Sequence, residues 1–234
     1  MALARYLPGG VLFLLLSGFA PTLAEPLGDE TFEGSLVCGA PAGDGEAMTV
    51  PCRATINPGA SEISLTLVMR NADAGGGRTF DRIELRRDGD KEPFQVLKGI
   101  GLRVPDGAEK GGLELVDVNF DGYFDLRARR AGPDDETLYQ NWVWSTEKNE
   151  FVDVPELDAI VSPQFNAEDQ EIVSHWKRAA DERGSDIYSY DGQMPLLIHR
   201  EIDRLSVDGA CTRIFYDRID DELKQTGSGA CDKE

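Results

Sequence analysis

The sequence predicts an all-β fold of antiparallel strands, arranged either as a propeller-like array or as a two-sheet sandwich. Two observations lead to this prediction. Short segments in which apolar and polar residues alternate recur along the chain, and clusters of Gly, Pro and Asp separate them. Only two short segments, Pro155 to Ile160 and Ala179 to Arg183, have a helical character. Short, regularly spaced strands of this kind are typical of sandwiches and propellers.

The clearest expected strands are short and carry many β-branched and aromatic residues. In chain order they are Ile63 to Met69, Phe80 to Arg86, Phe94 to Leu97, Gln140 to Trp144, Ile187 to Tyr190, Met194 to Ile202 and, as the last strand, Cys211 to Tyr216. Asp88-Gly89 and Asp191-Gly192 lie between pairs of these strands and predict hairpin turns. Trp142 and Trp144 stand two apart, so they share a strand face, and we expect them in the core.

The first 24 residues have the features of a secretory signal peptide. Arg5 supplies the positive charge, Val11 to Phe19 forms a short apolar segment, and Thr22-Leu23-Ala24 provides small residues before a cleavage point after Ala24. The apolar segment is too short to span a bilayer, and the residue directly after the cleavage point is Glu25, not a Cys. We therefore expect a soluble, exported protein, periplasmic in a bacterium, that is not lipid-anchored.

The remaining chain, residues 25–234, is expected to form a single all-β domain, with residues 25–60 as a disulfide-clipped N-terminal extension. The four cysteines are Cys38, Cys52, Cys211 and Cys231. An even number of cysteines in an exported chain suggests two disulfides. Three pairings are possible, and proximity in the sequence favours Cys38 with Cys52 and Cys211 with Cys231.

The chain carries 43 acidic and 24 basic residues, a net charge of −19. A charge of this size argues against binding to nucleic acid, whose phosphates would be repelled, and against anionic membrane surfaces. It favours encounter with basic partner proteins. Solubility and metal ligation are the alternative reasons for so many acidic residues.

The stretch from Asp117 to Asp125 reads D-x-N-x-D-G-x-x-D, which is the pattern of a calcium-binding loop. Oxygen-bearing side chains occupy loop positions 1, 3, 5 and 9, a glycine stands at the sharp turn of position 6, and the carbonyl of position 7 would point inward. Ca²⁺ prefers six to eight hard oxygen ligands, which this spacing brings together. The predicted ligands are Asp117, Asn119, Asp121, Tyr123 and Asp125. We expect the calcium ion to have a structural role.

The flanks of this loop differ from those of an EF-hand. Position 12 is Ala128, where an EF-hand places a bidentate Glu, and the segments on either side have the character of strands. The loop therefore resembles the strand–loop–strand calcium sites of FG-GAP repeats. Water or a nearby carboxylate from Glu114, Asp134 or Asp135 would complete the shell. The alternative is an acidic turn held by its own side chains.

No residue set in the sequence predicts an enzyme. The chain lacks a G-x-S-x-G motif, and neither His175 nor His199 has a suggestive Ser or Cys neighbour. The acidic pair Asp220-Asp221 lies in polar surroundings that would not raise a carboxyl pKa for glycoside hydrolysis.

From the calcium loop onward the chain resembles a known family. The segments that carry the resemblance are Val116 to Asp125, Tyr139 to Trp144 with Phe151, Ile160 to Pro163, Glu171 to Ser174, Ile187 to Gly192 and Leu196 to Ile198. Together they are similar to periplasmic calcium-binding proteins related to invertebrate-type lysozyme inhibitors, including immunity proteins against type IV-secreted peptidoglycan hydrolases. The resemblance covers residues 80 to 203. It implies an all-β fold, one structural calcium ion and binding of a basic, lysozyme-like hydrolase.

One motif of that family is absent. Invertebrate-type inhibitors insert an S-G-x-Y loop into the cleft of the enzyme, and the nearest segment here, Ser185 to Tyr188, has no glycine. The expected partner contacts are loop residues Asp134, Asp135, Asp186 and Tyr188. The alternative hypothesis is an FG-GAP-like structural or envelope protein with no enzyme target.

Overall fold

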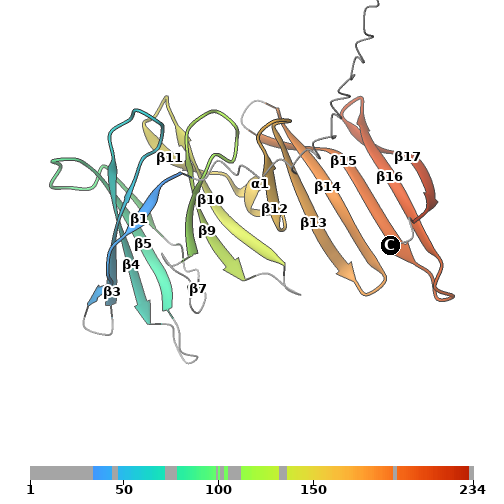
Figure 1. Ribbon diagram of the computed structural model, residues 1–234, viewed down its shortest axis with the longest axis horizontal. Helices are drawn as coiled ribbons and strands as arrows, with labels where there is room; N and C mark the ends of the chain where they lie inside the picture. Colours follow the sequence, from blue (N-terminus) through green and yellow to red (C-terminus); the bar gives the residue numbers. More distant parts are fainter. Residues whose placement is uncertain are drawn as a thin grey trace, which may run out of the picture. The chain divides into compact units, whose positions relative to one another are not determined.

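The computed structural model describes residues 34–43, 47–71, 78–98, 100, 103–104, 112–131, 136–191 and 194–231. These residues form an all-β fold, as predicted, with three antiparallel sheets and one short helix (Figure 1). Residues Thr31–Glu234 belong to one compact unit. No helix in the described ranges is long and apolar enough to cross a membrane. The predicted signal peptide lies outside the described residues.

The first sheet has its strands in the spatial order β1-β3-β4-β5-β6, with β2 paired to β3 and β7 paired to β5. Its strands are β1 (Leu36–Cys38), β2 (Ala42–Gly43), β3 (Ala47–Ala54), β4 (Ile63–Asn71), β5 (Arg78–Arg87), β6 (Gln95–Lys98) and β7 (Arg103–Val104). Alternate residues of β4 and β5 are β-branched or Leu, which favours a half-buried strand. β3 pairs with β4 along its whole length, so the described strands before position 60 belong to this sheet.

The second sheet has four strands in the order β11-β10-β9-β8. They are β8 (Leu113–Val116), β9 (Asp125–Ala131), β10 (Thr137–Ser145) and β11 (Glu150–Asp153). The predicted calcium loop is the connection between β8 and β9, which are antiparallel neighbours. A helix of one turn, α1 (Pro155–Asp158), follows β11 and confirms the prediction for Pro155 to Ile160.

The third sheet is a six-stranded meander, and Figure 1 shows its strands following one another in chain order. They are β12 (Pro163–Asn166), β13 (Glu171–Ala179), β14 (Glu182–Asp191), β15 (Met194–Leu205), β16 (Cys211–Ile219) and β17 (Glu222–Ala230). Two predictions are wrong here. Ala180 and Asp181 form a hairpin turn, with Ala179 at the end of β13 and Glu182–Arg183 at the start of β14. β17 follows the strand that was expected to be the last.

The largest core lies between the first and second sheets. Leu65, Leu67, Ile83 and Leu85 of the first sheet belong to the same buried cluster as a set from the second sheet. That set is Leu113, Leu115, Leu126, Ala128, Trp142, Trp144 and Phe151. The two tryptophans are thus core residues, as the sequence predicted. This face-to-face packing of two antiparallel sheets is that of a sandwich.

A smaller core joins the loop region of the second sheet to the third sheet. Its buried members are Val116, Val118, Leu157, Ile160 and Ile172, and Phe120, Phe165, Tyr188 and Tyr190 pack against them half-buried. The β8–β9 loop therefore lies where apolar contacts from the second and third sheets meet, and these contacts hold the loop in place.

Two disulfides join the pairs of cysteines that sequence proximity favoured. Cys38–Cys52 links β1 to β3, and Cys211–Cys231 links the start of β16 to the end of the chain beyond β17. Closing loops of this length stabilises a fold by about 3 kcal/mol per bridge. Disulfides of this kind are typical of exported proteins.

Candidate metal-binding loop

The backbone of the loop from Asp117 to Asp125 curls back on itself at two positions. Gly122 has φ +84°, and Phe120 has φ +61°, in the left-handed region that bulky residues rarely adopt. Such a conformation at a non-glycine residue costs about 1–3 kcal/mol and persists where surrounding contacts impose it. Glycine at the sixth position was expected from the sequence pattern, whereas the left-handed Phe120 was not.

The curled backbone points its N–H groups at the first carboxylate of the loop. Asp117 accepts hydrogen bonds from the N–H of Asp121 (3.2 Å) and of Gly122 (2.9 Å). Asp121 in turn accepts from the N–H of Tyr123 (2.8 Å) and from the side-chain amide of Asn119 (3.0 Å). The predicted ligand residues therefore already order one another within a single turn.

Asp125 is the best-ordered of the predicted ligands. Its side chain is fully buried, and its two oxygens accept hydrogen bonds from the N–H of Val118 (2.9 Å) and of Trp144 (2.7 Å). These bonds tie the loop to the neighbouring strand β10. Each carboxylate oxygen has two lone pairs, so both retain acceptor capacity for a cation.

Contacts from outside also fix the loop. The N–H of Phe124 donates to the carbonyl of Ile56 (2.6 Å), and the side-chain amide of Asn57 donates to the carbonyl of Gly122 (2.9 Å). From β14, the hydroxyl of Tyr190 donates to the carbonyl of Val118 (2.7 Å). All three sheets or their connections thus hold the loop in place.

The electrostatics of the loop are unfavourable in the absence of a cation. Burial raises the pKa of Asp125 well above its ordinary value, and the charges of Asp121 and Asp117 raise it further against the two backbone hydrogen bonds. Burial also raises the pKa of Asp117, and the charge of Asp121 adds to this. Burial, with the charges of all three carboxylates, raises the pKa of the Tyr190 hydroxyl. Among the described residues, none of the three carboxylates has an ion-pair partner.

The loop offers oxygen donors of the kind that Ca²⁺ selects: three carboxylates, one amide carbonyl and a backbone carbonyl. Its carboxylates are nevertheless not drawn together in this conformation. Within the described ranges, the one set of three possible metal-ligating side chains whose ligand atoms all lie within 4.8 Å is Asp203, Cys211 and Cys231. That set is no metal site, because its two cysteines form a disulfide.

The other residues predicted for the metal shell are Glu114, Asp134 and Asp135. Glu114 accepts a hydrogen bond from Arg127 at 2.6 Å and is thereby engaged elsewhere. Asp134 and Asp135, predicted both for this shell and as partner contacts, lie outside the described residues.

The two remaining predicted partner contacts are in a strand and not in a loop. Asp186, in β14, is only 3% exposed, and both its oxygens accept hydrogen bonds from Arg200, at 2.7 and 2.6 Å. Tyr188 is half-buried, and its hydroxyl donates to Asp186 at 3.3 Å. Burial and the Asp186 charge raise the pKa of Tyr188 to about 12. The expectation of Asp186 in a loop is wrong, because it pairs across neighbouring strands, whereas Tyr188 lies in the strand that was expected from Ile187 to Tyr190.

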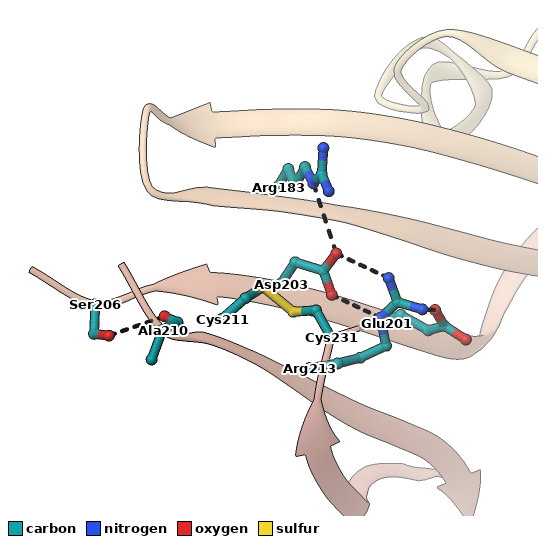
Figure 2. The surroundings of a disulfide bond; sticks show 8 residues. All are labelled: Arg183, Glu201, Asp203, Ser206, Ala210, Cys211, Arg213 and Cys231. Carbon is teal, nitrogen blue, oxygen red and sulfur yellow. Dashed lines mark hydrogen bonds and ion pairs between the residues drawn. A yellow bond between two sulfur atoms is a disulfide. The ribbon is translucent and has the colours of Figure 1, made fainter. Parts of the chain in front are cut away.

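The third sheet carries a set of ion pairs that the sequence did not reveal. Figure 2 shows Asp203 between two guanidinium groups: Arg213 donates to it at 2.7 and 2.9 Å, and Arg183 lies 3.6 Å away. The hydrogen bond from Arg213 is the main cause that lowers the pKa of Asp203. Each partner lies on an adjacent strand, so strand register, which sequence patterns do not fix, decides these pairs.

His199, the histidine closest to a possible catalytic arrangement, contacts carboxylates. Its Nδ1 lies 2.6 Å from Asp217 and its Nε2 lies 3.4 Å from Glu201, while Thr226 donates to the other oxygen of Asp217. Burial lowers the pKa of His199, but the hydrogen bonds to Asp217 and Glu201 outweigh this and raise it. Among the described residues, the hydrogen bonds of both ring nitrogens are with carboxylates and not with a hydroxyl.

The chain matches no known protein-family model and no curated protein sequence. Its fold is similar to that of a solved structure described as a Xanthomonas type IV secretion system related protein. The TM-score is 0.57 at 16% sequence identity, and the likeness covers 82% of this chain and 99% of that chain. At this identity the likeness shows a shared fold.

Proposed function

We propose that this protein is an exported, calcium-stabilised binding protein that inhibits, or gives immunity to, a lysozyme-like peptidoglycan hydrolase. The observation that carries the proposal is the fold likeness to a type IV secretion system related protein over 99% of that chain. The sequence resemblance to periplasmic calcium-binding inhibitors of lysozymes points to the same setting. The two disulfides fit a protein that folds in an oxidising compartment such as the periplasm.

Calcium binding at the β8–β9 loop is part of this proposal. When bound, the ion would balance the charges of Asp117, Asp121 and Asp125, with Asn119 and the carbonyl of Tyr123 as further ligands. Asp125 supports this assignment most strongly, because it is a fully buried carboxylate for which the described residues supply no cation. A cation at this position would remove a cost that the fold otherwise carries.

The charge of the chain supports a basic protein partner. A net charge of −19 accelerates the encounter with a positively charged enzyme and gives an affinity that falls as salt is added. Blocking an enzyme requires a complementary surface and no chemistry, so we propose that the protein is not itself an enzyme.

The test is a binding and inhibition assay with the chain from Glu25 onward. A panel of purified basic lysozymes and peptidoglycan hydrolases would be titrated by calorimetry and assayed on peptidoglycan, in calcium and at two salt concentrations. We expect a 1:1 complex that stops hydrolysis and weakens with salt. Salt-sensitive binding without loss of hydrolysis would favour a structural or envelope role. No binding across the panel would contradict the proposal.

A further inference from the structure

A cavity of about 460 Å³ lies directly beside the β8–β9 loop. Its walls are mainly apolar, and its rim carries polar groups. Three phenylalanines, Phe120, Phe124 and Phe165, form the walls with Val116 and Pro58. Asp117 lies on its lining, so the cavity and the predicted metal site share a wall.

The cavity is built by the same conformation that shapes the loop. Phe120 and Phe124 flank the sharp turn at Gly122, and Phe120 enters the cavity wall because its φ is +61°. Its ring packs edge-on against Phe165 at 6.3 Å and against Tyr190 at 6.0 Å between ring centroids. The strained residue is thus held by aromatic contacts, and strain of this kind gathers at functional sites.

The surroundings of the cavity are acidic. The turn after β12 contributes Ala167 and Gln170 to the lining, and the two residues between them, Glu168 and Asp169, are exposed. Asp117 also lines the cavity, but the calcium ion proposed above would balance its charge, so Glu168 and Asp169 supply the negative charge beside the cavity. Together with the net charge of −19, this arrangement selects an apolar group that is accompanied by positive charge.

We propose that this cavity, which we call the phenylalanine groove, receives an apolar side chain flanked by Lys or Arg on the surface of a basic partner protein. This inference rests on the proposed function and places the contact with the partner enzyme at this groove. A side chain buried in a well-packed pocket often carries much of the affinity of a protein interface, and complementary charge around it adds specificity and speeds association. Because loop residues form two of its walls, the groove is shaped by whatever stabilises the loop.

The test uses a peptide probe, so that it does not depend on finding the enzyme. The isotope-labelled chain from Glu25 onward, in calcium, would be titrated with acetyl-Lys-Phe-Lys amide and followed by amide chemical shifts. We expect shifts centred on Phe120, Phe165 and Gln170. The acidic peptide acetyl-Glu-Phe-Glu amide should bind at least tenfold more weakly. Shifts elsewhere, no shifts, or equal binding of the two peptides would overturn the proposal.

Two matched variants sharpen the result. Ala167→Arg places a bulky cation in the groove at an exposed turn position, and Ala180→Arg makes the same change at an exposed turn of the third sheet. Both should keep the wild-type melting temperature. The first should weaken binding of the basic peptide by more than tenfold, and the second should leave it unchanged. Equal effects of the two variants would overturn the proposal.

The enzyme assay then separates the groove from the function. If a hydrolase from the panel binds wild type and Ala167→Arg equally, the groove proposal fails and the proposed function stands. If the peptide fills the groove but no hydrolase binds, the proposed function fails and the groove stands as a binding site for basic segments. A dimer in sedimentation that only Ala167→Arg abolishes would replace the partner by a second copy of the chain and overturn the proposal.

Discussion

Asp125 at the end of the β8–β9 loop and Asp186 and Asp203 of the third sheet are all buried, but they are stabilised in different ways. In the sheet, Asp186 pairs with Arg200 and Asp203 pairs with Arg213, each through two short hydrogen bonds. In the loop, Asp125 is fully buried and accepts hydrogen bonds only from backbone N–H groups. The sheet supplies its own cations, whereas the described part of the chain provides none for the loop.

This difference indicates where a ligand is needed. Burying an unpaired charge is costly, so proteins pair such a charge, neutralise it or bind a metal ion. In the sheet, arginines of the same sheet pair with the buried carboxylates. The directions of the pKa shifts agree, because arginines lower the pKa of Asp203 in the sheet while burial raises the pKa of Asp125 in the loop. A cation from solution would bring the loop to the same state as the sheet.

The largest expected effect is on the sheet side of the comparison. Asp186→Ala would leave the guanidinium of Arg200 and the hydroxyl of Tyr188 without their partner beside a buried position. Removing one member of a buried ion pair costs about 3 kcal/mol or more. We therefore expect the free energy of unfolding, measured by urea denaturation, to fall by about that amount, with the response to calcium unchanged.

The matched control removes both charges. Replacing Asp186 by Leu and Arg200 by Met together should cost less than the single change, because apolar residues of similar volume can substitute for a buried pair. A double variant that is as unstable as the sum of the two single variants would show that the pair is not coupled. The Asp186–Arg200 pair would then not be an example of a buried carboxylate neutralised within the sheet, with which the loop could be compared.

A smaller effect is expected from Asp125→Asn in the loop. The amide can accept one of the two backbone hydrogen bonds but places an NH₂ group against the other N–H donor, which costs about 2 kcal/mol when variant and wild type are compared in chelator. Adding calcium should not raise the stability of the variant, because its calcium response should disappear. Asp181→Asn, at an exposed turn, makes the same chemical change and should leave both stability and the calcium response intact. A calcium response retained by Asp125→Asn would contradict the assignment of this ligand.

The smallest effect concerns pH. The pKa of Asp203 is lowered in the folded protein, so its contribution to stability is present above the unfolded pKa of about 3.9 and is lost as the pH falls through the folded value. The pKa of Asp125 is raised, so without calcium its charge costs stability above the folded pKa, and this cost is relieved as the pH falls through it.

Carboxyl-carbon NMR titration in chelator checks both directions. We expect Asp203 to titrate below the ordinary value and Asp125 above it. Adding calcium should lower the apparent pKa of Asp125 and leave that of Asp203 in place. Two carboxyl groups that both titrate below the ordinary value in chelator would remove the contrast between the regions.

Local patterns in the sequence predicted much of the fold. Alternation in β4 and β5, the turn at Asp88-Gly89 and the spacing of the cysteines depend on neighbouring residues only, and the structure confirms them. β17 was missed, because Gln225 to Ala230 is rich in Gly, Ser and Thr and has no apolar face. Its turn uses Asp220 and Asp221 at φ +53° and +63°, which makes these acidic residues a hairpin signal.

The candidate site was predictable in part for the same reason. The metal-loop pattern lies within nine consecutive residues, so its residues could be named from spacing alone. Asp186 was misplaced in a loop because its pairing with Arg200 depends on the register of β14 against β15. The phenylalanine groove brings Phe120 into contact with Phe165 from another sheet. Sequence patterns describe neighbouring residues only and do not predict this contact.

The most direct test of the account is a thermal melt of the chain from Glu25 onward, in millimolar calcium and in chelator, for wild type, Asp121→Ala and the exposed control Asp181→Ala. A ligand that binds only the folded state at about one hundred times its Kd adds about 2.7 kcal/mol. For a chain of this size that corresponds to a rise in Tm of roughly 5 to 10 °C. We predict this rise for wild type and Asp181→Ala and its loss in Asp121→Ala. Equal Tm values for wild type in calcium and in chelator would contradict the central claim that the loop is completed by calcium.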